Sequence, residues 1–170
     1  MKKIILLIAL TVTSMVTNAQ SFFDSLEDMD GVDMVVVNKD MFELLSKFGP
    51  DKMKDNEAMQ IFTMIRDLKN LKVFSTDDAI IADKMETMAN SAIKKHNLTE
   101  LMRIKEDDSR VKIYVKSTKN KEYVSEVLMF IKGIDKQTKG ISKSMIVSLT
   151  GNIDINKLSA LADTFTEKNK

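Results

Sequence analysis

Apolar positions recur at helical spacing in the first half of the chain and alternate in the second half. The first run after residue 30, VDMVVVNK (32–39), is β-branched and bounded by turn-forming residues, so it is predicted to be a buried strand. A short helix is predicted next, because Asp40 and Glu43 have the spacing of a capping box and Gly49-Pro50 forms a stop. Its expected apolar stripe consists of Met41, Leu44, Leu45 and Phe48.

Two more helices and a strand are predicted between residues 50 and 100. A helix over about 56–68 follows from the three- and four-residue spacing of Ile61, Met64, Ile65 and Leu68. The segment NLKVFST (70–76) has the composition of a strand. Thr76, Asp77 and Asp78 then provide the acidic start of a long helix that reaches Asn97. The expected buried stripe of this helix is Ile81, Met85, Met88 and Ala92.

From about residue 101 the apolar period is two. The segments LMRIK, RVKIYVK, YVSEVLMFIK and ISKSMIVSLTG are separated by short polar turns, which predicts a four-strand antiparallel meander. A last helix, DINKLSALADTF, is expected to be capped by Asp154 and to bury Ile155, Leu158, Leu161 and Phe165. The chain is therefore predicted to be α+β: an antiparallel sheet with a C-terminal four-strand meander and helices packed mainly on one face.

The first 19 residues have the three parts of a secretory signal peptide. Lys2 and Lys3 are basic, IILLIALTVTSMV is apolar, and TNA supplies the small residues of a cleavage site before Gln20. The apolar run is shorter than the roughly 20 residues of a membrane span. We expect cleavage after Ala19, a single domain over residues 20–170 without a transmembrane span, and a periplasmic or extracellular location.

The composition of the expected mature chain excludes several classes of function. Removing Lys2 and Lys3 leaves 24 basic and 25 acidic residues, so no electrostatic argument favours nucleic acid as a partner. The chain has no cysteine, which excludes disulfides, thiolate metal sites and thiol catalysis. Its five glycines form neither a Gly-x-Gly-x-x-Gly nor a Walker pattern, which makes nucleotide chemistry improbable.

The order of these segments resembles an exported bacterial family, the domain of unknown function 4252. The residues that carry the resemblance are VDMVVVNKDMFELL, LKVFSTDDAIIADKM, LMRIKEDDSRVKIYVK and MIVSLTGNIDINKLSALAD. The resemblance implies a small protein with a signal peptide. Some members of the family are lipoproteins, but this chain lacks the cysteine to which a lipid would be attached. The family has no established activity, so the resemblance implies no site residues.

Three residue groups have side chains that could form a site. Asp28, Asp30 and Asp33 surround Gly31 but fail the register of a calcium-binding EF-hand, and the preferred interpretation is a turn into the first strand. Met85 and Met88 could bind Cu(I), yet the same spacing is what a core stripe requires. His96 is the only histidine and is expected at the C-terminus of a helix, where its charge favours the dipole. We therefore expect no catalytic, cofactor or metal residues.

Two classes of function remain. We favour a non-enzymatic binding module of the cell envelope, whose partner is an envelope protein or a lipid-like apolar ligand; the alternative is an enzyme that uses dispersed carboxylates. The segment YVSEVLMFIK is apolar on both of its alternating sets. A sheet covered by helices on one face should be polar on the other face. The excess of apolar side chains on β-strand 123–132 must therefore be covered, either by more of this chain or by a partner. The candidate binding face consists of Tyr123, Val127, Met129 and Ile131. A strand buried on both sides by the chain's own helices is the other interpretation.

Overall fold

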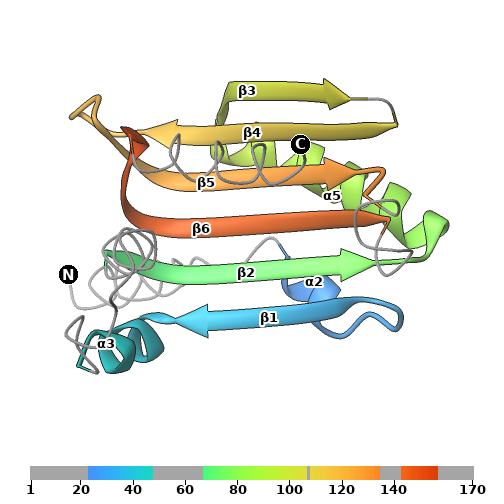
Figure 1. Cartoon of the computed structure of the whole chain (residues 1–170), viewed down its shortest axis with the longest axis horizontal. Coiled ribbons are helices and arrows are strands. Elements are labelled where there is room, and N and C mark those ends of the chain that lie inside the picture. The colour runs from blue at the N-terminus through green and yellow to red at the C-terminus, as the bar shows by residue number, and fades with distance from the viewer. Residues whose placement is uncertain (1–22, 48–66, 107, 135–142, 157–170) are drawn as a thin grey trace, which may run out of the picture.

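The computed structural model describes residues 23–47, 67–106, 108–134 and 143–156. Its six strands form one antiparallel sheet in the order β1-β2-β6-β5-β4-β3 (Figure 1). Their bounds are Asp33–Asn38 for β1, Leu68–Thr76 for β2, Thr99–Glu106 for β3, Ser109–Ser117 for β4, Tyr123–Lys132 for β5 and Ser144–Asp154 for β6. The helices are α2 (Asp24–Glu27), α3 (Lys39–Lys47) and α5 (Ala79–His96). This arrangement confirms the α+β class and the C-terminal meander.

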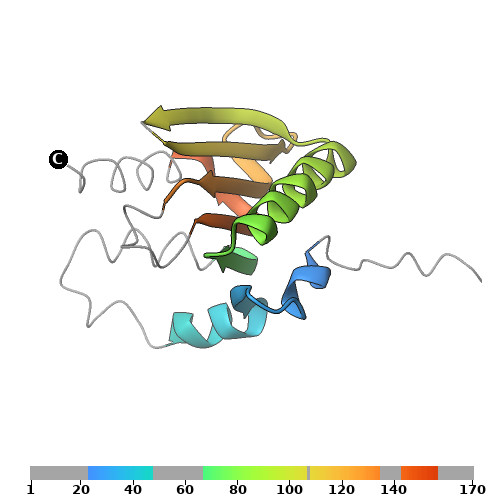
Figure 2. The ribbon, with the colours of Figure 1, turned by 90° about the vertical axis from the view of Figure 1, so that its right-hand side faces the viewer.

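Helices α2 and α5 lie on the same side of the sheet (Figure 2), which we call the helical face. Met85 and Ala92 are buried in α5 as predicted, and Ala82 and Ala89 are buried beside them. The side chains that meet α5 from the sheet include Phe74, Leu128, Phe130 and Ile146. Small alanines on the buried side of α5 allow the helix to approach these large side chains closely.

The start of α5 has the acidic cap that the sequence predicts, and its end has a left-handed cap. The Asp78 carboxylate accepts hydrogen bonds from the backbone N–H groups of Ile80 (2.6 Å) and Ile81 (3.0 Å). At the other end Asn97 has a φ of 54°, and its backbone N–H donates to the carbonyl groups of Ile93 and Lys94. A capped start and a left-handed end fix the length of α5.

The opposite side of the sheet, which we call the second face, is apolar across every strand. One cross-strand row, the apolar row, consists of Val35, Val73, Val147, Met129, Ile113 and Met102. Phe42 of α3 and Ile155 join the cluster of side chains on this face. Antiparallel sheets usually have one polar, solvated face, so this composition is unusual for a face that lies opposite α2 and α5.

Strand β1 was predicted to be buried, and this prediction was wrong. Among the described strands β1 pairs with β2 alone and forms one edge of the sheet, with all its residues exposed except the half-buried Val37. β-Branched residues favour an extended backbone, but they do not distinguish a central strand from an edge strand.

Helix α3 forms where it was predicted, but a different side is buried. Asn38 replaces the expected Asp40 as the capping residue, since its side chain accepts a hydrogen bond from the N–H of Met41 (3.1 Å). Phe42 is buried, whereas Met41 and Leu44 of the expected stripe are exposed. The side chain of Leu45 and the residues Phe48, Gly49 and Pro50 lie outside the described residues.

The remaining predictions are tested only in part. Residues 48–66 are outside the described residues, and with them most of the helix predicted over 56–68, although Leu68 begins β2 and does not belong to a helix. The last helix begins as predicted, because Asp154 accepts a hydrogen bond from the N–H of Asn156 (2.9 Å) and residues 155 and 156 are helical. Leu158, Leu161 and Phe165 lie beyond the described part of the chain.

Candidate functional site

The candidate binding face predicted on β5 is rearranged by a bulge in the strand. The register between β5 and β6 shifts between Val124 and Glu126, so an extra residue is inserted there. As a result Val124, and not Tyr123, joins Val127 in the cluster on the second face. Alternation alone cannot reveal a bulge, because the extra residue changes the phase of the pattern without changing its composition.

The other three residues predicted for this face differ in how accessible they are. Val127 is 1% exposed and belongs to the core. Met129 and Ile131 are half-buried, and their cross-strand neighbours Val147 and Met145 are half-buried too. The accessible part of the second face therefore lies toward the end of β5 that contains Ile131, away from Phe42 and Ile153.

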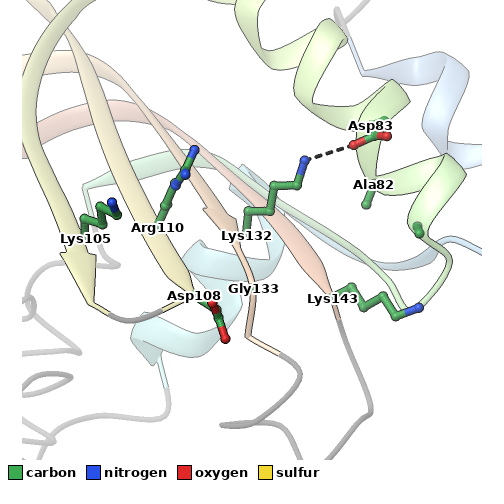
Figure 3. Close-up of a pocket in the computed structure, with 9 residues that line it drawn as sticks. Ala82, Asp83, Lys105, Asp108, Arg110, Lys132, Gly133 and Lys143 are labelled. Atoms are coloured by element: carbon green, nitrogen blue, oxygen red, sulfur yellow. Dashed lines mark hydrogen bonds and ion pairs between the residues drawn. The ribbon is translucent and has the colours of Figure 1, made fainter.

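A polar pocket of about 660 Å³ lies on the helical side, between the start of α5 and the ends of strands β3 to β5 (Figure 3). Its charged lining residues are Lys105, Arg110, Lys132, Lys143, Asp83 and Asp108. Sequence reasoning missed this pocket, because its residues come from five separate segments that only the fold brings together. Its excess of basic groups can attract an anion.

Lys132 is the central charge of the pocket. Its ammonium group lies 2.9 Å from a carboxylate oxygen of Asp83 and 2.9 Å from one of Glu86, both on α5. The hydrogen bond to Glu86, followed by the one to Asp83, raises the pKa of Lys132 above its ordinary value. The two carboxylates are therefore engaged in holding α5 to β5, an arrangement that leaves neither of them positioned as a free general acid or base.

His96 makes a contact that the sequence did not predict. Its Nδ1 lies 2.7 Å from Oε1 of Glu126 on β5, and Glu126 is the more buried of the two side chains. The two residues are 30 positions apart, so no local pattern could have indicated the pair. The contact joins the last turn of α5 to the sheet, in addition to the helix-dipole interaction expected for a histidine at this position.

The acidic segment before β1 serves as the predicted turn. Gly31 has a φ of +80°, and its carbonyl accepts a hydrogen bond from the hydroxyl of the buried Thr76 (2.7 Å). In the part of the chain that the structure describes, no three histidine, aspartate or glutamate side chains converge as a metal site. Met85, one of the two candidate copper ligands, is fully buried in the core, and Met88 packs against the same cluster.

Comparison with known proteins identifies the family but no relative of known activity. Among the described residues no helix is both long enough and apolar enough to cross a membrane. No curated protein and no solved structure matches the chain. The family described as Domain of unknown function (DUF4252) matches residues 23–161, which covers all the described strands and confirms the resemblance seen in the sequence. This chain belongs to the DUF4252 family.

Proposed function

We propose that the chain is an exported, non-enzymatic binding module of the cell envelope that holds an apolar surface of a partner protein against the second face of its sheet. The observation that carries the proposal is the apolar row, which crosses all six strands without a polar residue. The helical face is more polar than this: the row that contains Phe74, Ile146 and Phe130 continues into Lys112 and Arg103.

Only two described side chains from outside the sheet, Phe42 and Ile155, join the cluster on the second face. They lie near one end of it, with Val124, Val127 and Ile153. Val73, Met129, Ile131, Met145 and Val147 retain partial exposure. Contiguous apolar surface of this kind is typical of a protein interface.

A protein partner fits this surface better than a small apolar ligand. Sites for small molecules are concave and enclose most of the ligand. The polar pocket beside α5 is lined by charged side chains and lies on the other side of the sheet. An extended sheet face instead suits a partner of comparable size. Met129 and Met145 add side chains that can repack against an irregular apolar surface.

Export is part of the proposal because it determines which partners the module can meet. The basic start, the apolar run and the TNA cleavage site support it. Because the mature chain has no cysteine, the oxidising conditions outside the cytoplasm cannot form disulfides in it.

The test is site-specific photo-cross-linking in the native envelope. A benzophenone amino acid replaces Ile131 on the second face or, as the control, Ile80, an exposed isoleucine at the start of α5. We expect one envelope protein to be cross-linked from position 131 and not from position 80. The Ile131→Lys variant should lose this partner in co-purification, whereas Ile80→Lys should retain it.

Two results would overturn the proposal. If a stoichiometric lipid, and no protein, is recovered with the purified chain, the partner is not a protein surface. If Lys substitutions at Met129 and Ile131 unfold the domain, and the milder Ile131→Thr variant folds and still captures the same protein, the second face is core and the binding surface lies elsewhere.

A further inference from the structure

The two edges of the sheet differ in a way that bears on association. At the β3 edge, Glu100, Arg103 and Lys105 are charged, and a bulge interrupts the register between Glu100 and Met102. Charges and bulges are the devices by which proteins keep an edge strand from pairing with another chain. The β3 edge is therefore protected.

The β1 edge lacks this protection. Met34, Val35 and Val36 are 48%, 57% and 44% exposed, and charged residues occur only at its ends, as Asp33 and as Lys39, which follows the strand. Among the described residues β2 is the one strand that pairs with β1, so the outer backbone groups of β1 have no strand partner there. An exposed, apolar edge strand is a template for another strand.

We propose that two copies of this chain associate through antiparallel pairing of their β1 strands about a two-fold axis at Val36. A two-fold axis perpendicular to the sheet keeps the helical face on the same side in both copies. In this arrangement, residues that lie opposite one another in the two copies point to the same face of the sheet. Residues of one strand share a face when they are an even number of positions apart, so each residue lies opposite the same position or a position an even number of residues away. Centring the axis on Val35 or on Val36 meets this condition.

The charges at the ends of β1 select the axis at Val36. With that axis Val36 lies opposite itself, Val35 lies opposite Val37, and Met34 lies opposite Asn38. Asp33 of each copy then lies at the end of the strand pair where Lys39, the first residue of α3, follows the strand of the other copy. With the axis at Val35, Asp33 would instead lie opposite Val37 and gain no countercharge. Lys39 is available for this pairing, because its contact with Glu43 is between two exposed side chains and contributes little to stability.

The second copy also explains the composition of the edge. Pairing β1 with β1 places Val36 beside its copy on the helical face and Val35 beside Val37 on the second face, and it continues the sheet from one copy into the other. This inference does not depend on the proposed partner of the second face, since that proposal is tested at Met129 and Ile131 and this one at β1.

The first experiment uses the absence of cysteine in the chain, which makes any introduced thiol unique. Residues directly opposite in a strand pair have Cβ atoms about 4.5–5.5 Å apart, close enough for a disulfide after small adjustment. Under mild oxidation Val36→Cys should form a covalent dimer. Val35→Cys should react much more slowly, because in this register it lies diagonal to its copy, and Leu101→Cys, equally exposed on the β3 edge, is the matched control.

The second experiment tests the charge pairing by sedimentation of the full mature chain at roughly 100 μM, where a micromolar dimer is populated. Asp33→Lys and Lys39→Asp should each be monomeric, because each places like charges opposite one another. A mixture of the two variants should form dimers, since both contacts are then between opposite charges. This readout does not require a substitution in the apolar part of the strand.

Each of three results would overturn the inference. A wild-type chain that remains monomeric at this concentration excludes the dimer. Leu101→Cys cross-linking as fast as Val36→Cys shows that the reaction reports exposure alone. Faster reaction of Val35→Cys, or no dimer in the mixture of charge variants, shows that the register is wrong.

Discussion

Lys72 is the residue that connects α2 to the sheet. It lies on β2 with a side chain that is 12% exposed, and its ammonium group lies 3.0 Å from Asp24 and 2.5 Å from Glu27. Burial opposes its charge, but the hydrogen bonds that Lys72 donates to Glu27 and Asp24 outweigh burial and raise the pKa of Lys72 above its ordinary value. A largely buried charge of this kind is stabilising only while its partners are present.

Replacing Lys72 with Met should lower the free energy of unfolding by about 1.5–3 kcal/mol, the range for hydrogen bonds to charged groups. The raised pKa means that this contribution is fully present below the unfolded value of about 10.4 and is lost as the pH rises through the folded value. Urea unfolding at pH 7 measures the loss. Arg103→Met, which removes an exposed ion pair with Glu100 on the β3 edge, is the control and should change little; equal effects in the two variants would contradict the role of Lys72.

Phe130 anchors the centre of the helical face. It is 4% exposed, lies opposite Ile146 on β6, and belongs to the cluster that includes Met85 and Leu128. Phe130→Ala should cost about 3–5 kcal/mol of unfolding free energy, because it removes a buried ring and leaves a cavity. That loss is a large part of the total free energy of unfolding of a typical domain, which is about 5–15 kcal/mol. A loss below about 1 kcal/mol in urea unfolding would contradict this assignment of the core.

At the scale of elements, α5 depends on its first turn. The two backbone hydrogen bonds to Asp78, led by that from Ile81, lower the pKa of the Asp78 carboxyl. Asp78→Ala should therefore lower the thermal unfolding midpoint at pH 7. Because the folded pKa is depressed, the stabilisation is present above the unfolded pKa of about 3.9 and disappears as the pH falls through the folded value.

The difference between wild type and Asp78→Ala should thus shrink when thermal unfolding is measured in acid. The neighbouring variant Asp77→Ala provides the control, because Asp77 is not the capping residue. A midpoint that falls equally in both variants would mean that general charge near the helix, and not the cap, stabilises α5.

Local patterns were sufficient for some elements and insufficient for others. The bounds of β5 and the cap of α5 were predictable, because alternation and capping depend on neighbours in sequence. The exposure of β1, the buried side of α3 and the pairing of His96 with Glu126 were not. Each of these depends on which segments meet in space, and neither propensity nor periodicity contains that information.

At the scale of the whole molecule, the sheet has two unlike faces and two unlike edges. The helical face has its helices and also contains ion-paired lysines, whereas the apolar row crosses all six strands of the second face. One edge has charges and a bulge, and the other has an apolar strand. Neither the composition nor the near-neutral charge of the chain could reveal these asymmetries, because they average over the faces and edges.

The proposed export would determine where these surfaces act, and it leads to the last prediction. Thr17 and Ala19 provide the small side chains that signal peptidase reads, so the exported chain should begin at Gln20. Intact-mass measurement of the native protein should show a loss of residues 1–19, with or without cyclisation of Gln20. Ala19→Arg should block processing, because a large charged side chain does not fit the cleavage site, whereas Asn18→Arg should still be cleaved. Native protein that retains Met1 in the membrane fraction would contradict export as a soluble chain, and the second face would then have to bind its partner from a membrane-anchored position.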